Sequence, residues 1–270
     1  MSAPVRALAA AGLLLLASCA VTPVPRLAAP PDPDRVRSRL LQEEAATRTV
    51  RGLARLAFEG PSGSGSASQA VVVALPDRAR VEALTPLGTT ALVATVRAGE
   101  LRAHSPVRHE YWTGRATREA LGRLLTVPVP PEPLLRLLAG LPPLPLRAQD
   151  PRLSVTPDGA PVRVESVDGE SWQRLWIEGD DPEVARGEMG SASEALFTFA
   201  FADRRPTDGR SFPFDIRVEE SAGRSRLQVR YEQVQLNLPA DPDLFHLPPP
   251  TDPRTRIINL GSGAPGRVAP

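Results

Sequence analysis

Apolar and polar residues alternate along several short stretches of the chain. In the first of them Val50 and Leu56 fall on one face, whereas Arg51 and Arg55 fall on the other. A period of two is the pattern of a β-strand with one buried face. The same alternation recurs over residues 69–75, 78–83, 90–97, 162–165, 196–201, 214–219 and 226–231. Turn residues follow the first of these stretches, so the pattern predicts successive hairpins in an antiparallel sheet with one apolar face.

The middle of the chain carries a helical pattern instead. Thr117 is suited to cap a short helix, and the prolines of 128–133 end that helix and start a second one, which closes at Gly140. Leucines cover most of the circumference of the second helix, so it must be covered on more than one side. A further helix is predicted over 33–48, where Asp32-Pro33 is typical of a helix start. These elements predict a mainly β fold, with one antiparallel sheet curled around a helical insert and one N-terminal helix.

The chain opens with a predicted targeting segment over residues 1–18. Arg6 precedes an apolar run that is too short to span a bilayer as a stable helix and fits the apolar core of a signal peptide. The run ends in Leu16-Ala17-Ser18-Cys19, which resembles a bacterial lipobox, so we expect Cys19 to become a lipidated N-terminus. The alternative is an ordinary secretory peptide with an incidental cysteine. The position of this Cys, which is the only one in the chain, favours lipidation.

The mature chain is predicted to have three parts. Residues 19–33 are rich in proline and are expected to form an extended, lipid-anchored tether. A single domain is expected over 34–250, because no internal linker is long enough to divide it. Residues 251–270 are rich in Pro and Gly and are expected to form a disordered tail. By resemblance to bacterial sorting rules, Ala20 implies that the lipid sits in the outer membrane, at its periplasmic face.

Composition narrows the chemistry that this chain can perform. Its 270 residues are 41% hydrophobic and carry a net charge of +1, which allows a large core and indicates no nucleic-acid partner. Every one of the 32 basic residues is Arg, which excludes a P-loop lysine and a Schiff-base lysine. A single Cys excludes a disulfide framework and a zinc site with several cysteines.

Few residues are candidates for catalysis or metal binding. The three histidines are His104, His109 and His246, and no HExxH, GxSxG or Walker pattern accompanies them. Asp180, Asp181 and Glu183 imitate an acidic cation site, but their context favours a solvated loop. Because no nucleophile, base and orienting residue can be named together, we expect neither an enzyme nor a bound cofactor or metal.

A sheet curled around a leucine-rich insert encloses either a packed core or a cavity for acyl chains, and composition alone favours the packed core. One loop favours the cavity. Thr85-Pro86-Leu87-Gly88 is expected at a tight turn with Leu87 at its tip. A single exposed leucine is common, but on a protein lipidated at Cys19 it is placed to enter a membrane or to contact the hydrocarbon chain of a partner.

Residues 49–145 resemble LolB-like outer-membrane lipoproteins of the LolA/LolB lipoprotein-carrier superfamily. Val50–Leu56 is similar to the opening strand of that family, and Leu84–Leu92 is similar to its strand–loop–strand unit with an exposed leucine. Residues 118–142 are similar to its paired helices. The C-terminal half is longer than the family pattern, and its ending resembles uncharacterised lipoproteins related to LolB.

The resemblance implies a half-barrel of about eleven antiparallel strands with a helical lid over a hydrophobic cavity. It implies that the cavity accepts acyl chains of lipoproteins or other lipids from a periplasmic LolA-like carrier, and that Leu87 inserts into the membrane. The expected function is therefore insertion of such chains into the outer membrane, without covalent chemistry. The residues expected to line the cavity are Leu56, Phe58, Val71, Val73, Leu92, Val96, Leu134, Leu137 and Leu138.

The alternative function is a non-catalytic interaction or assembly lipoprotein of the outer membrane. Such a protein would use the same fold as a docking module, with a filled interior and without lipid transfer.

Overall fold

The computed structural model describes residues 33–61, 63–85, 87–125, 127–145, 152–155, 162–178 and 183–261. The predicted signal peptide, the lipidation at Cys19 and nearly all of the predicted tether lie outside the described residues.

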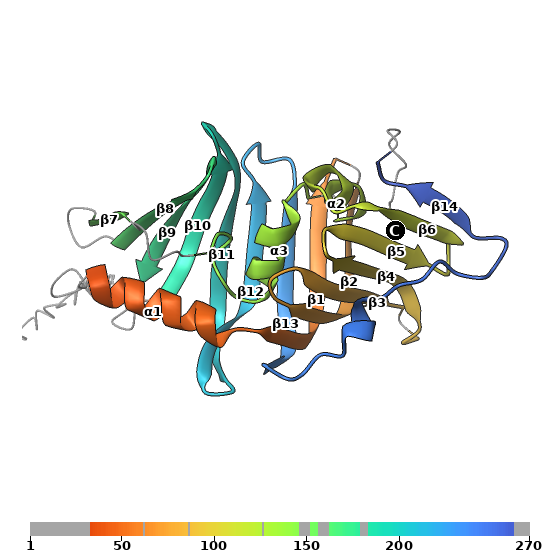
Figure 1. The fold of residues 1–270 in the computed structure, drawn as a ribbon, viewed down its shortest axis with the longest axis horizontal. Coiled ribbons are helices and arrows are strands. Elements are labelled where there is room, and N and C mark those ends of the chain that lie inside the picture. Colours follow the sequence, from red (N-terminus) through yellow and green to blue (C-terminus); the bar gives the residue numbers. More distant parts are fainter. Residues whose placement is uncertain are drawn as a thin grey trace, which may run out of the picture.

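One open sheet of 14 strands dominates the described residues (Figure 1). Its spatial order is β14-β6-β5-β4-β3-β2-β1-β13-β12-β11-β10-β9-β8-β7. The strands are β1 (Thr49–Gly60), β2 (Gly63–Ala74), β3 (Arg78–Leu84), β4 (Thr90–Arg97), β5 (Glu100–Ser105), β6 (Glu110–Arg115), β7 (Arg152–Val155), β8 (Val162–Asp168), β9 (Ser171–Glu178), β10 (Glu183–Ser191), β11 (Glu194–Thr207), β12 (Arg210–Glu220), β13 (Arg226–Leu236) and β14 (Arg256–Asn259).

The sheet consists of two antiparallel meanders that meet where β1 pairs with β13. Only the β14–β6 pair is parallel among the described pairs. The predicted fold class, a mainly β, curled antiparallel sheet with helices, is confirmed. The described residues form 14 strands rather than about eleven, because the long C-terminal half continues the sheet through β7 to β13.

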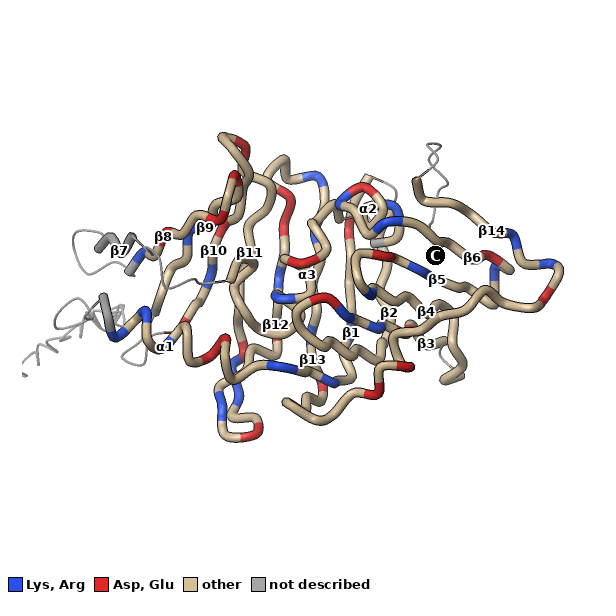
Figure 2. The backbone as a smooth tube through the Cα atoms, in the orientation of Figure 1, with Lys and Arg blue, Asp and Glu red and all other residues tan. Residues whose placement is uncertain are grey.

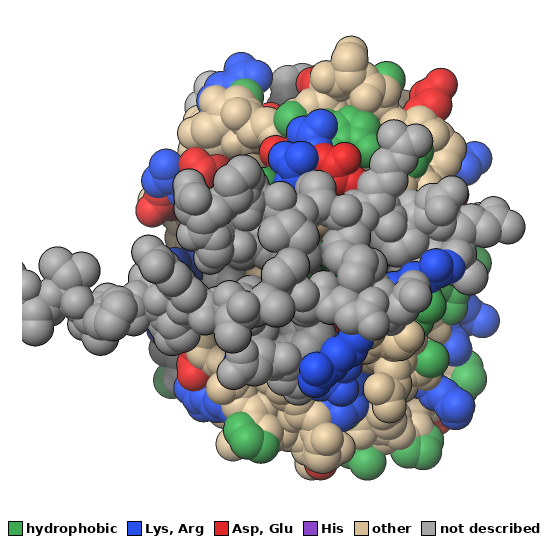
Figure 3. Space-filling model, turned by 90° about the vertical axis from the view of Figure 1, so that its left-hand side faces the viewer, with side chains coloured by type: hydrophobic (Ala, Val, Ile, Leu, Met, Phe, Trp, Pro, Cys, Tyr) green, Lys and Arg blue, Asp and Glu red, His purple; other side chains and the backbone are tan. Residues whose placement is uncertain are grey.

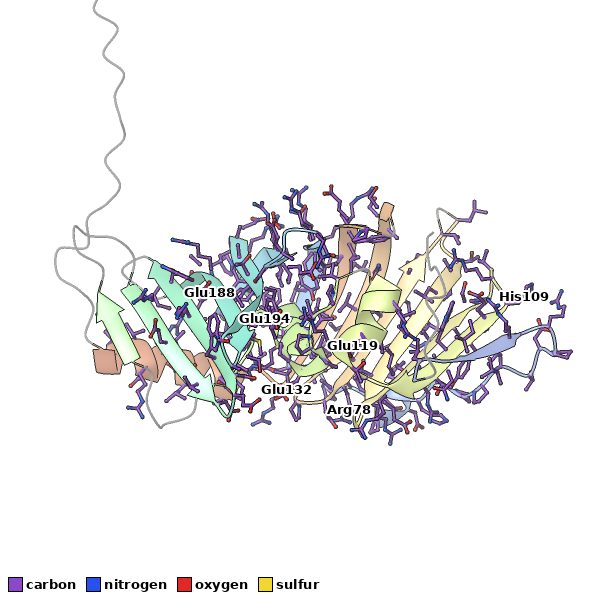
Figure 4. All side chains as sticks on the ribbon, turned by 90° about the horizontal axis from the view of Figure 1, so that it is seen from above. Arg78, His109, Glu119, Glu132, Glu188 and Glu194 are labelled. Atoms are coloured by element: carbon purple, nitrogen blue, oxygen red, sulfur yellow. The ribbon has the colours of Figure 1, made fainter. Side chains whose placement is uncertain are left out.

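In the part of the chain that the structure describes, three α-helices accompany the sheet: α1 (Pro33–Ala46), α2 (Arg118–Leu125) and α3 (Pro131–Leu138). The sheet curves around α2 and α3, which lie over its central strands (Figures 1 and 4). The predicted cap at Thr117 is confirmed, because its Oγ1 accepts a hydrogen bond from the Ala120 backbone N–H at 3.1 Å. The predicted end at Gly140 is also confirmed. Gly140 has φ +74°, and a side chain there would press on Phe212 and Pro213, so glycine is needed at this turn.

The core lies between the concave face of the sheet and the helices. Strand alternation directs apolar residues such as Leu56, Val229 and Phe199 to this face, and all three are buried. Residues Pro133 to Leu138 of α3 are buried on every side, as the leucine pattern predicts. Val36 and Leu40 of α1 join the same core, so the N-terminal helix belongs to the domain.

The segment after β13 covers the convex face of the meander formed by β1 to β6. The short 3-10 helix η2 (Pro242–Phe245) buries Phe245, and the Tyr111 hydroxyl donates a hydrogen bond to the Leu247 main-chain oxygen at 2.8 Å. Beyond it, β14 pairs with β6. Described structure thus continues beyond residue 250, and residues 262–270 of the expected tail lie outside the described residues.

Charges of both signs are distributed over the whole sheet (Figure 2). Arginine and acidic side chains also appear together on the described surface at the α1 end (Figure 3). None of the described helices is both long enough and apolar enough to cross a bilayer.

Candidate functional site

An apolar cavity of about 80 Å³ lies between the concave face and the two central helices. Strands β1 to β5 and β13 form its floor, and leucines of α2 and α3 form its roof. The lining residues are Leu56, Gln69, Val71, Ala79, Val81, Ala83, Leu92, Ala94, Thr95, Val96, Leu101, Leu121, Leu124, Leu134, Leu135, Leu138 and Leu227. The arrangement favours a hydrocarbon ligand, because almost all of these side chains are apolar.

Six of the nine residues predicted to line a cavity contribute to it: Leu56, Val71, Leu92, Val96, Leu134 and Leu138. Val73 and Leu137 are fully buried in the core but do not line this cavity. Phe58 packs against the edge of the core and borders a separate groove.

Sequence reasoning missed several residues of the lining. Leu121 and Leu124 of α2 belong to the helical pattern, but the pattern alone does not show that they reach the same space as the strands. Leu227 comes from β13, which is adjacent to β1 only through a pairing distant in sequence. Gln69 alternates with Val71 along β2, so its inward direction could have been read from the sequence.

Buried polar contacts fasten α3 over the cavity. Arg136, whose side chain is 8% exposed, donates to the main-chain oxygen of Pro142 at 2.8 Å and pairs with Glu44 of α1 at 3.2 Å. The Tyr231 hydroxyl of β13 donates to the Leu138 main-chain oxygen at 2.8 Å. Burial raises the pKa of Tyr231 above the usual range of a phenol, so this donor keeps its proton at physiological pH.

Leu87 lies in the β3–β4 connection and is 91% exposed. On either side of it, the backbone N–H of Thr85 donates to the Thr89 main-chain oxygen at 2.8 Å, and that of Gly88 donates to the Thr85 oxygen at 2.9 Å. These bonds hold the turn while the leucine side chain projects into solvent. The predicted exposure of Leu87 is thus observed, whereas membrane insertion remains a prediction.

Among the described candidate groups, His109 and Glu183 lie in two separate ion pairs. His109 faces Asp252 at 3.4 Å, and hydrogen bonds from Arg254 are the main reason that the pKa of this carboxyl falls to about 2. Glu183 pairs with Arg204 at 3.2 Å, while Asp180 and Asp181 lie outside the described residues. Within the described ranges, no three His, Cys, Asp or Glu side chains are grouped to hold a metal ion.

A second hollow, an open groove of about 820 Å³, crosses β2, β1 and β13 to β9. Its polar residues, such as Gln228 and Arg217, alternate with buried core residues, so the groove lies on the face opposite α2 and α3. Arg217 pairs with Asp215 at 2.7 Å. Arg186 instead stacks on the Trp176 ring at 4.7 Å. The groove therefore combines paired charges with aromatic and other apolar side chains.

Comparison with known proteins identifies the fold. No family model and no curated protein matches the sequence. Among solved structures, a DUF1329 family protein from Desulfovibrio piger matches 79% of this chain and 96% of its own, at 9% identity and a TM-score of 0.55. A LolA superfamily protein from Nitrosomonas europaea matches 78% and 96%, at 11% identity and a TM-score of 0.52.

A third match is a domain assigned to outer-membrane lipoprotein sorting from Vibrio parahaemolyticus. It covers 77% of this chain and 95% of its own, at 10% identity and a TM-score of 0.51. The chain thus has a LolA/LolB-like fold, as the sequence resemblance implies.

Proposed function

We propose that this chain binds acyl chains of lipoproteins or other lipids beneath α2 and α3 and releases them into the outer membrane, to which a lipid on Cys19 anchors it. The observation that carries the proposal is the apolar cavity under these two helices. The LolA/LolB-like fold and the exposed Leu87 support it.

The proposal requires the helices to move, because the cavity is small. A volume of about 80 Å³ holds roughly five to eight water-sized spheres, which is too little for a whole acyl chain. Ligand entry must therefore displace leucines of α3, such as Leu134 and Leu138. The contacts of Arg136 and Tyr231 would then set the free-energy cost of displacing this helix.

A difference in affinity would set the direction of transfer. Burial of an acyl chain contributes roughly 25 cal/mol per Å² both in a cavity and in a bilayer. The cavity additionally requires α3 to be displaced, so the bilayer is the better environment once the chain is close to it. Leu87 would bring the protein to the membrane or to a periplasmic LolA-like carrier, and no nucleotide is required.

The test uses the full chain carrying Cys19→Ser. We expect a fluorescent fatty acid to bind and to be displaced by hexadecanoic acid, and we expect mass spectrometry of the purified protein to detect co-purified acyl lipid. The control variant is Leu53→Asn, which changes a leucine that is 40% exposed and outside the cavity lining. It should bind the probe as the parent does. If neither displaceable probe nor extracted lipid is found, the proposal is rejected.

The open groove on the convex face favours a second candidate function, a docking module of the outer membrane that does not carry lipid. Its volume of about 820 Å³ is ten times that of the apolar cavity. In that case Arg217→Glu together with Arg226→Glu would abolish envelope function, and enlarging or filling the apolar cavity would not affect it.

A further inference from the structure

We infer that Gln69 selects acyl ligands that carry a hydrogen-bond donor, either a hydroxyl group or an amide N–H, along or next to the chain. The inference rests on the proposed function and adds a substrate class to it. Gln69 would then be a specificity residue inside an otherwise apolar site.

The position of Gln69 directs its amide into the cavity. On β2, Gln69 alternates with Val71 and Val73 on the concave face, and it lines the cavity together with Val71. Its direct neighbours on the adjoining strands are Ala54 on β1 and Ala83 on β3. Both neighbours are small, so space remains beside the Gln69 amide.

Among the described residues that line the cavity, Gln69 is the only one whose polar side chain points into it. Thr95 also borders the space, but it alternates with Ala94 and Val96 and therefore turns to the convex face. The leucines of α2 and α3 across the cavity provide no polar group.

The Gln69 carbonyl oxygen lacks a hydrogen-bond partner. The residue is 8% exposed, and no described group donates to its Oε1 atom. Buried side-chain acceptors in proteins are nearly always satisfied, and an orphan acceptor in a dry site is unfavourable. A donor supplied by a ligand would remove this deficit at the point where the cavity wall is otherwise hydrocarbon.

The nature of the acceptor restricts the donor to a neutral group. An amide oxygen accepts from a hydroxyl or from an amide N–H without ionisation, whereas a cationic donor would lose its hydration in an apolar space. A plain alkyl chain would fill the volume but leave Oε1 unpaired. The same amide does not titrate, so the selectivity should be independent of pH.

Three hexadecanoyl probes of equal chain length test the inference: methyl hexadecanoate without a donor, methyl β-hydroxyhexadecanoate, and hexadecanamide. They are titrated against the full chain carrying Cys19→Ser. We expect one or both donor probes to bind roughly 2- to 10-fold more tightly than the ester, the gain from one neutral hydrogen bond. Whichever of the two is preferred identifies the hydroxyl or the amide N–H as the partner of Gln69.

Two variants separate recognition from packing. Gln69→Met keeps the length of the side chain and removes the acceptor, so it should erase the preference while retaining binding of the ester. Leu92→Met, on the same cavity wall, should alter all three affinities together. Gln69→Met should also unfold at an equal or higher urea concentration than the parent, because an orphan acceptor has been removed.

Equal binding of all three probes to the parent would overturn the inference while leaving the proposed function intact. A preference that survives in Gln69→Met would assign recognition to another group and would overturn it as well. Failure of every probe to bind would reject the proposed function together with the inference.

Discussion

The hydroxyl of Tyr231 donates a hydrogen bond to the main-chain oxygen of Leu138 at 2.8 Å. Both residues are buried, with 3% and 7% of their surfaces exposed. The contact joins the end of α3 to β13, so it ties the roof of the apolar cavity to the centre of the sheet.

Tyr231→Phe should weaken this tie while preserving the packing of the ring against Phe212, whose centroid lies 5.5 Å away. The Leu138 oxygen loses its buried donor, so we expect the free energy of unfolding to fall by about 1–3 kcal/mol. If α3 is the lid, release of a bound acyl probe should also become faster. Urea denaturation and stopped-flow dilution measure the two effects, and an unchanged release rate would argue against a lid at this position.

Alkaline pH should reveal the same contact. Burial raises the pKa of Tyr231 in the folded protein, so the native state retains a proton that the unfolded state releases. The resulting stabilisation is fully present below the unfolded pKa of about 10 and is lost as the pH rises towards the higher folded value. We therefore expect Tyr231→Phe to lose less stability than the parent above about pH 10.

Tyr111 provides the comparison for this pH experiment, since the chain has only two tyrosines and burial also raises the pKa of Tyr111. Its partner, the Leu247 oxygen, lies on the convex face, away from α3. Tyr111→Phe should reduce the alkaline loss of stability but leave acyl release unchanged. Equal effects of both substitutions on release would contradict the assignment of Tyr231 to the lid.

Much of the fold follows from the sequence because the concave face imposes a simple alternation. The stretches around Leu56, Val71 and Phe199 show it clearly, and all three became strands of the sheet. Strand β9 was not predicted, because its large apolar residues Trp172 and Trp176 lie on the convex face, each beneath an arginine.

A buried glutamine obscures β9 further. Gln173 lies on the concave face with no exposed surface, where its Nε2 donates to the Leu144 oxygen at 3.1 Å and its Oε1 accepts from the Leu144 N–H at 3.0 Å. Because β9 has a polar residue on its buried face and tryptophans on its outer face, the alternation of polar and apolar residues does not identify it as a strand. Strand β14 was missed for another reason, because it is stabilised by pairing with β6, more than a hundred residues earlier.

The candidate site was less predictable than the fold. Strand alternation indicates that Leu56, Val71 and Val73 face inward, but it does not say which of them the helices cover closely. That depends on the position of α3 over the sheet. This position in turn depends on contacts between residues far apart in sequence, such as the ion pair between Arg136 and Glu44. Consequently the strand faces were predictable, whereas the size of the cavity was not.

Arg136→Met should be among the most destabilising substitutions in the helical insert. It removes a buried guanidinium that donates hydrogen bonds to the main-chain oxygens of Pro142 and Leu144. It also removes the ion-pair partner that Arg136 provides to Glu44. Loss of one member of a buried pair costs about 3–5 kcal/mol, and partial exposure of Glu44 places the expected loss near the lower figure. Glu44→Gln should cost about 1 kcal/mol, because the contacts of Arg136 with the two main-chain oxygens remain.

Urea denaturation followed by tryptophan fluorescence measures both free energies of unfolding. Equal losses for the two variants would show that the ion pair, rather than the binding of main-chain oxygens, holds α3 in place.

Leu87→Glu should separate ligand binding from delivery. The side chain is 91% exposed and makes no core contact, so stability should change by less than about 0.5 kcal/mol. Affinity for acyl probes should also be unchanged, while transfer of a bound probe to phospholipid vesicles should become slower. A fluorescence transfer assay compares it with Val107→Glu, which changes another exposed apolar turn residue, 68% exposed. If both variants slow the transfer equally, the added surface charge, rather than the loss of Leu87, causes the effect.

Leu134→Ala and Leu137→Ala compare two buried leucines of the same helix, of which only Leu134 lines the cavity. Each truncation should cost about 2–5 kcal/mol, because it removes buried methyl groups and leaves a void. In Leu134→Ala the new space joins the existing cavity, so a saturating acyl ligand should occupy it and restore part of the lost stability by mass action. In Leu137→Ala the void is separate and the ligand should restore much less. Thermal unfolding with and without hexadecanoic acid measures the difference. Equal restoration in both variants would mean that the ligand does not enter beneath α3, and the acyl-binding proposal would then have to be moved to another site.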